Sequence, residues 1–102
     1  MTTDAERVAA AVARCPTVSR LSGGMVGEVA TYLPGRRIPG VVIREAASGP
    51  EVSVHVVGWY GPAMSEIARE VDSAVHSVLP GHRVHVTIDD LDTPDRDPAV
   101  PA

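Results

Sequence analysis

The chain has 102 residues and a net charge of −4, and its nine basic residues are all arginine. This length suits one domain, and a mildly acidic chain is repelled by phosphate backbones and anionic lipid unless its arginines cluster. The chain has no lysine, asparagine or glutamine, so it lacks Schiff-base lysines and common water-positioning amides, which disfavours an enzyme. Hydrophobic residues make up 44% and aromatic residues 3%, so we expect a core of valine, isoleucine, leucine and alanine.

The single cysteine, Cys15, excludes an intramolecular disulfide and favours a reducing compartment. The N-terminal segment carries acidic residues early and has no long apolar run, so no signal peptide is expected. No stretch approaches the roughly 18 apolar residues that a membrane span needs. We therefore expect a cytoplasmic protein without direct membrane insertion.

A first helix is predicted from about residue 4 to residue 14. Thr3 and Glu6 have the spacing of a capping box, and alanines and valines follow at helical intervals. Pro16 ends this helix, because the residue before a proline is pushed out of the helical region. Cys15, at the same end, is interpreted as a small half-buried residue, since no neighbour in the sequence suggests a reactive thiol.

Two short strands are expected next, at residues 17–21 and 28–33. Between them, Gly24–Gly27 matches the G-x-x-G pattern that some RNA-binding domains place between two helices. The flanks here read as strand and loop rather than as a helix pair. A flexible turn is therefore the preferred interpretation, and a nucleic-acid-binding loop is the alternative.

A turn at Pro34–Gly35 precedes the adjacent arginines Arg36 and Arg37. This pair is expected on a loop, where it could bind an anion. The favoured interpretation is a solvated edge that blocks unwanted strand pairing. The run at 38–44 is then expected to pair as an antiparallel hairpin with a strand at 51–59.

The strand at 51–59 is the centre of the predicted fold. Successive side chains of a strand point to opposite faces of the sheet. Its valines at 52, 54 and 56 are therefore expected to face the helices. The residues expected on the opposite face are Ser53, His55, Val57 and Trp59.

A second helix is predicted from Met64 to Leu79, with one apolar stripe and early acids that suit the positive end of the helix dipole. Pro80–Gly81 ends it, and alternating valine, isoleucine and polar residues predict a last strand at 82–88. From Asp89 the chain is acidic and rich in proline, which indicates a disordered tail, so the domain is placed at 1–90 and the tail at 91–102. The predicted fold is α/β of the α+β type, with a mainly antiparallel sheet and two helices packed on one face.

His55 and His85 are both expected on the sheet face away from the helices, in strands that are candidates for neighbours. A zinc site would need a third protein ligand with sensible spacing, and Glu51 and Asp89 are weak candidates for it. Polar residues on a solvated sheet face are the ordinary explanation. No metal ligand, cofactor-binding residue or catalytic residue is therefore assigned.

Trp59 and Tyr60 stand together at the end of the central strand. Aromatic residues concentrate at interfaces, although Trp59 is equally compatible with packing over the end of the core. The residues predicted to contact a partner are Trp59, Tyr60, Arg36, Arg37 and His55.

Four motifs follow one another along the chain: the glycine-rich element after a first strand at 18–24, the V-x-V strand that ends at Tyr60–Gly61, the helix segment at 65–71 and the strand at 84–88. Taken together in this order, they resemble the alkaline shock protein family, also called Gls-type or envelope stress response proteins. The segment 30–37 resembles a feature of the actinobacterial branch. The chain departs from the family at Ser65, where proline is common and serine is a good helix cap. It departs also at 25–39, which reads as a helix in many members and is broken here by prolines and glycines.

The resemblance implies a non-enzymatic cytoplasmic protein linked to envelope stress, with no catalytic residue to carry over and no cofactor. Some members self-associate and are held at the membrane by a separate anchoring protein. The expected partners are therefore further copies of the chain and a membrane-anchored protein, and no nucleic acid is expected. The alternative function is a small nucleic-acid-binding module that uses Gly24–Gly27 and the arginines, and a small phosphohydrolase ranks third.

Overall fold

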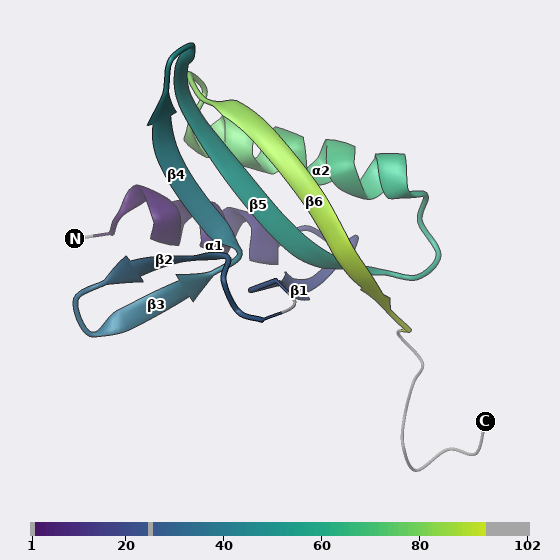
Figure 1. The fold of residues 1–102 in the computed structure, drawn as a ribbon. Helices are drawn as coiled ribbons and strands as arrows, with labels where there is room; N and C mark the ends of the chain where they lie inside the picture. The colour runs from purple at the N-terminus through teal and green to yellow at the C-terminus, as the bar shows by residue number, and fades with distance from the viewer. Residues whose placement is uncertain (1, 25, 94–102) are drawn as a thin grey trace.

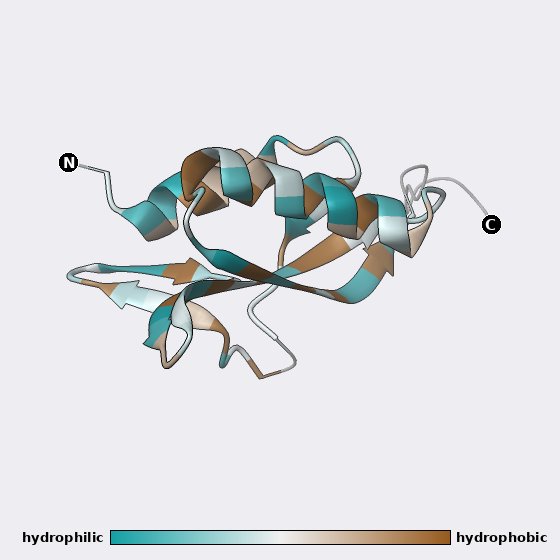
Figure 2. Ribbon diagram, turned by 90° about the horizontal axis from the view of Figure 1, so that it is seen from above, coloured by the Kyte–Doolittle hydropathy of each residue, from teal (hydrophilic) through white to brown (hydrophobic). Residues whose placement is uncertain are grey.

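The structure of the protein is a computed structural model that describes residues 2–24 and 26–93. The helices and strands follow one another as α1 (Asp4–Ala13), β1 (Val18–Leu21), β2 (Ala30–Leu33), β3 (Arg36–Pro39), β4 (Val41–Ala46), β5 (Gly49–Trp59), α2 (Met64–Val78) and β6 (Arg83–Asp92). Both helices lie against one face of the main sheet, and the β2–β3 hairpin projects to one side (Figures 1 and 2). The predicted α+β class, with mainly antiparallel pairing, is confirmed.

The longest strand, β5, is the centre of the main sheet and pairs along both of its edges. One edge pairs with β6 in parallel from Glu51 to Trp59. The other edge pairs antiparallel with β4 along its first half and with β1 along its second half. β4 and β1 therefore share one edge of β5, and the predicted hairpin between the 38–44 run and the central strand is confirmed for β4.

The junction between β4 and β1 lies opposite His55. The His55 backbone N–H donates to the Gly40 carbonyl at 2.9 Å, and the His55 carbonyl accepts from the Ser22 N–H at 2.8 Å. Gly40 has a φ of +80°, and a Cβ there would lie 2.8 Å from the His55 carbonyl oxygen. Glycine is therefore required at the point where the chain enters β4.

The core forms between the helices and the valine face of β5, as the alternation of the central strand predicts. Val52, Val54 and Val56 are fully buried. They pack with buried residues from both helices, which are Ala5, Val8, Val12, Ile67, Val71 and Val75. Since apolar side chains of the helices and β5 come together only in this layer, burial fixes which face of the sheet the helices cover.

Both helices begin close to the predicted residues, but their N-termini are capped differently. The predicted capping box of α1 is present, because Thr3 Oγ1 accepts from the Glu6 N–H at 3.2 Å and Glu6 Oε1 accepts from the Thr3 N–H at 3.1 Å. The cap residue of α2 is Ala63, which makes no side-chain cap hydrogen bond. The prediction that Ser65 caps α2 is wrong, because the chain turns into the helix two residues earlier and leaves Ser65 in the first turn.

The segment after the glycine-rich turn forms a separate two-stranded sheet, in which β2 and β3 pair from Ala30↔Pro39 to Leu33↔Arg36. Arg36 and Arg37 therefore open a strand, and their predicted place on a loop is wrong. Ile38, predicted in the strand that pairs with β5, belongs to β3 and is buried in the core. The hairpin forms because the Pro34–Gly35 turn reverses the chain while the positive φ of Gly40 separates β3 from β4.

The last strand is longer than predicted, because β6 continues to Asp92. Asp89–Asp92 were predicted to open a tail, and this prediction is wrong. The difference arises because β6 continues to pair with β5 past the bulge that lies opposite Val56 and Val57. At the end of this pairing, the Tyr60 N–H donates to the Asp92 carbonyl at 2.8 Å. The rest of the predicted tail, residues 94–102, lies outside the described residues.

Candidate functional site

The sheet face opposite the helices is the candidate interaction surface. No helix of the described ranges covers it, and Figure 1 looks onto it. On β6 it exposes Arg83, His85 and Thr87, and on β5 it carries the partly exposed Ser53, His55 and Trp59. We call this set of six residues the open sheet face. The prediction that Ser53, His55 and His85 share one face is consistent with the register Ser53↔His85, and the register His55↔Thr87 places Thr87 beside them.

Val57 departs from the open sheet face, although the alternation of β5 predicts it there. It is only 2% exposed. Arg20, Ser22 and Gly24, from β1 and the loop after it, line a hollow of about 220 Å³ together with Val57, Asp89 and Asp90. The loop after β1 therefore covers this end of the face, which leaves Trp59 as its aromatic feature.

Each histidine of the open sheet face lies beside a carboxylate. His55 Nδ1 is 3.2 Å from Asp89 Oδ2, and His85 Nε2 is 3.4 Å from Glu51 Oε2. The two carboxylates that the sequence suggested as weak metal ligands thus each lie within hydrogen-bonding distance of one histidine. Among the described residues, no group of three metal-binding side chains comes together.

Glu51 joins the face to the neighbouring strand β4. Its Oε1 accepts from Arg44 Nε at 2.9 Å, while Oε2 faces His85. The hydrogen bond from Arg44 lowers the pKa of the Glu51 carboxyl, and His85 acts in the same direction. Glu51 is therefore a charged bridge across three strands at the end of the sheet where β4 and β5 meet.

Trp59 and Tyr60 lie at the opposite end of β5. The Trp59 N–H donates to the Thr17 carbonyl at 2.9 Å, and its side chain is partly exposed. Tyr60 is 69% exposed. The aromatic pair therefore has a backbone that the sheet holds in place and side chains that solvent reaches.

The two predicted contact arginines lie elsewhere and point to different neighbours. Arg36 forms an ion pair with Glu6 of α1. Arg37 donates through Nη2 to the Gly27 carbonyl at 2.7 Å. The five predicted contact residues thus occupy separate places: Trp59 and Tyr60 form one group, His55 lies in the middle of β5, and the arginines lie on the hairpin.

The glycine-rich loop is held by its own side chains. Its flanking elements are β1 and β2, which agrees with the preferred turn interpretation. A Glu28 carboxylate oxygen accepts from the Val26 N–H at 3.0 Å, and a Cβ at Gly24 would lie 2.8 Å from the same carboxylate. The Glu28 carboxylate thus occupies one backbone donor of the loop, and the Gly24 N–H donates to Ser22 Oγ at 3.2 Å.

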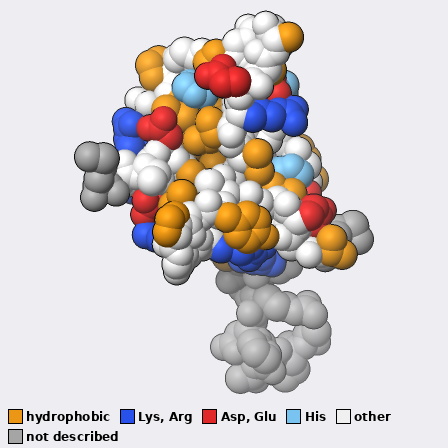
Figure 3. Space-filling model, turned by 60° about the vertical axis from the view of Figure 1, so that its left-hand side comes forward, with side chains coloured by type: hydrophobic (Ala, Val, Ile, Leu, Met, Phe, Trp, Pro, Cys, Tyr) orange, Lys and Arg blue, Asp and Glu red, His pale blue; other side chains and the backbone are white. Residues whose placement is uncertain are grey.

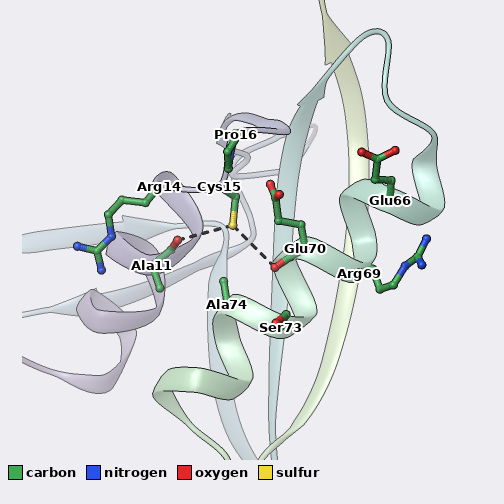
Figure 4. A pocket seen from close by; sticks show the side chains of 9 residues that line it. All are labelled: Ala11, Arg14, Cys15, Pro16, Glu66, Arg69, Glu70, Ser73 and Ala74. Atoms are coloured by element: carbon green, nitrogen blue, oxygen red, sulfur yellow. Dashed lines mark hydrogen bonds between the residues drawn. The ribbon is translucent and has the colours of Figure 1, made fainter.

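A groove that the sequence analysis missed lies between the end of α1 and the first half of α2 (Figure 4). It has a volume of about 830 Å³, and its lining residues are Ala11, Arg14, Cys15, Pro16, Glu66, Arg69, Glu70, Ser73 and Ala74. The alanines on facing helices were the available signal, because small residues leave space between helices. Arg14 and Arg69 point away from Cys15 in Figure 4.

The Cys15 thiol lies at the base of this groove and hydrogen-bonds to backbone carbonyls. Its Sγ is 3.7 Å from the Ala11 oxygen and 3.9 Å from the Glu70 oxygen. Burial raises the pKa of the Cys15 thiol, and the negative charge of Glu70 raises it further. These surroundings favour the protonated thiol over the nucleophilic thiolate.

Comparison with known proteins identifies no relative: no family model, no curated protein and no solved structure matches the chain.

None of the helices in the described ranges has the length and apolar character to cross a membrane. On the side drawn in Figure 3, acidic, basic and hydrophobic side chains are interspersed, and no broad patch of one charge gathers there.

Proposed function

We propose that this protein is a non-enzymatic, envelope-stress-response-like protein that acts by self-association and by binding a partner. In this proposal it is cytoplasmic, resembles the alkaline shock protein family, and reaches the membrane only through a membrane-anchored partner. The chain order of β5, α2 and β6 is the order that the family resemblance implies for its central strand, helix and last strand. The β2–β3 hairpin replaces the helix that many members are expected to have, so it is a feature of this chain.

One observation carries the proposal: the open sheet face has no covering helix in the described ranges and ends in an aromatic pair. This face combines a partly exposed tryptophan with histidines and an arginine, and an amphipathic aromatic residue on a polar face is a common interface anchor. Such a mixture suits a surface that a partner covers part of the time. The raised pKa of Cys15 disfavours thiolate chemistry at that residue.

The test is Trp59→Ala, measured by light scattering across protein concentration beside thermal unfolding of the same variant. If Trp59 is a hot spot, association should weaken by about 2 kcal/mol or more, while the fold persists. Tyr32→Ala is the matched control, because Tyr32 is an aromatic residue that is 70% exposed on the hairpin. A Trp59→Ala protein that loses stability but associates normally wherever folded would place Trp59 in the core and the interface elsewhere.

The second candidate, a nucleic-acid-binding module, draws support from the arginines beside the glycine-rich loop. Arg20 lines the same hollow as Gly24, and Arg37 contacts Gly27. The net charge of −4 and the Glu28 carboxylate in the loop oppose it. Any RNA or DNA binding is therefore expected to be weak and to vanish near physiological salt. A salt-resistant, sub-micromolar complex with single-stranded RNA would promote this candidate above the first.

A further inference from the structure

The outer edge of β6 is an unpaired strand edge among the described residues. β6 has ten residues and, within residues 2–24 and 26–93, pairs with β5 alone, along its inner edge. α2 packs on one face of the sheet beside it and leaves the edge itself open (Figure 1). A long free edge exposes unpaired backbone donors and acceptors and is a template for another strand.

The hydrogen bonds of β5 determine which residues of β6 face this edge. His55 turns its N–H and carbonyl toward Gly40 and Ser22, on the β4–β1 side, whereas the Tyr60 N–H donates to Asp92 of β6. The backbone N–H and carbonyl groups of the even-numbered residues of β5 therefore point toward β6. In the parallel register Val54↔Val86, they bond to the odd-numbered residues of β6. The N–H and carbonyl groups that point outward are consequently those of Val84, Val86 and Ile88.

We propose that two copies of this chain join edge to edge through β6, antiparallel, about a twofold axis at Val86. In this register Val86 pairs with its own counterpart, and Val84 pairs with Ile88 of the second copy. All of these residues present outward N–H and carbonyl groups, so the pairing is a regular antiparallel ladder. The two main sheets become one continuous sheet, and the open sheet faces of both copies lie side by side.

Charge and hydropathy select this register. It places Arg83 opposite Asp89 of the second copy, twice by symmetry, which is a favourable cross-strand pair. Arg83 is exposed and forms no ion pair within residues 2–24 and 26–93. On the other face, the partly buried Val84, Val86 and Ile88, which pack against the core, meet apolar residues of their own kind.

The bulge in β6 limits how far the pairing can run. β6 carries one extra residue between the register pairs Val56↔Ile88 and Val57↔Asp90. A twofold axis at Thr87 would extend the pairing beyond Asp89. Past the bulge, the backbone N–H and carbonyl groups that point outward no longer alternate in the register of the preceding residues. An axis at Val86 places the regular stretch from Arg83 to Ile88 in the ladder, and only the terminal charge pair reaches the bulge residue Asp89. The inference rests on the self-association in the proposed function and assigns that self-association to a specific edge.

The deciding comparison is Val86→Pro against Val86→Ala, by sedimentation equilibrium of the full chain. Proline removes the outward N–H of Val86 and keeps a backbone that an edge strand tolerates. Alanine removes side-chain packing but keeps the N–H. Val86→Pro should weaken dimerisation at least about tenfold, since both central hydrogen bonds are lost, and Val86→Ala should weaken it less. Thermal unfolding of both variants verifies that they are folded.

A charge exchange tests the register without touching the backbone. Arg83→Glu alone should weaken the dimer, because it places like charges opposite each other. Adding Asp89→Arg should restore dimerisation, even though Asp89→Arg also removes the contact with His55. Arg14→Glu, an exposed charge reversal on the far side of the sheet from this edge, should leave dimerisation unchanged. Failure of the double variant to recover association, with the fold intact, would overturn the register.

The outcomes separate this inference from the proposed function. Self-association that Trp59→Ala weakens and Val86→Pro does not would overturn pairing through β6 while supporting the proposed function. A wild type that stays monomeric at high concentration would overturn both the edge pairing and the self-association. Association that both Val86→Pro and Arg83→Glu weaken, and that the charge exchange restores, is the result expected here.

Discussion

Glu70 and Thr17 are joined by a two-point hydrogen bond that ties α2 to the start of β1. Glu70 Oε1 accepts from the Thr17 N–H at 2.9 Å and from the Thr17 hydroxyl at 2.7 Å. Thr17 is buried, so loss of this acceptor would leave buried donors without a partner, which is costly. The contact also fixes the first half of α2 beside the groove that Cys15 borders.

Glu70→Ala should lower the free energy of unfolding by about 1–3 kcal/mol, because both donors of Thr17 lose their acceptor. The measurement is urea unfolding at neutral pH. Glu66→Ala, on the exposed side of the same helix, is the control and should cost about 0.5 kcal/mol. Equal losses in the two variants would show that the contact with Thr17 adds nothing beyond what an exposed glutamate of the same helix contributes.

Two glycines separate the cost of a left-handed backbone from the cost of a steric clash. Gly35 and Gly40 have φ values of 74° and 80°. A Cβ at Gly35 meets nothing within 4 Å, whereas one at Gly40 lies 2.8 Å from the His55 oxygen and 2.9 Å from the Ser22 oxygen. Gly35→Ala should cost about 1 kcal/mol, and Gly40→Ala about 3 kcal/mol or more. Chemical denaturation decides, and similar costs would mean that the β4–β1 junction is loosely packed.

Val54 and Ser53 test the two faces of the central strand. Val54 is fully buried under the helices, whereas Ser53 lies on the open sheet face. Val54→Ala should cost about 1–3 kcal/mol through lost burial and a cavity. Ser53→Ala should cost well under half of that amount. Thermal unfolding of both variants is the measurement, and a reversed order would contradict the assignment of the faces.

Glu51 should make stability depend on acid. Its pKa is lowered from an ordinary value near 4.5, first by the hydrogen bond from Arg44. A carboxyl with a lowered folded-state pKa contributes stability above its unfolded pKa and loses it as the pH falls through the folded value. The stability difference between wild type and Glu51→Gln should therefore be largest at neutral pH and shrink below about pH 4.5. Unfolding of both proteins between neutral and acid pH measures it.

Arg44→Ala provides the control for the acid dependence. Without the Arg44 guanidinium, the main cause of the lowered pKa of Glu51 is gone. In the Arg44→Ala background, most of the pH-dependent difference in stability between the protein with Glu51 and the Glu51→Gln variant should therefore disappear. A difference that persists unchanged in the Arg44→Ala background would assign the acid dependence to His85 or to another group.

Local sequence patterns were sufficient to predict the elements whose stability is decided by nearby residues. The capping box of Thr3 and Glu6 and the apolar period of Val8 and Val12 specify α1, because helix contacts join residues three and four apart. The alternation of Val52, Val54 and Val56 likewise identified the buried face of β5. Pairing between β4 and β5 followed from two neighbouring apolar runs joined by a short polar loop.

The tertiary structure decided what depends on residues far apart in the chain. Val57 is buried where β1, the loop after it and β6 come together around it, and Asp89–Asp92 join the sheet because Tyr60 and Ser19 bind Asp92 from other elements. Periodicity contains no information on which loop will cover a strand or on where a strand finds its last partner. Of the candidate surfaces, the sequence indicated Trp59 and Tyr60. The edge of β6 that is free among the described residues depends on α2, which carries the chain back to the outer side of β5, where β6 pairs in parallel through its inner edge.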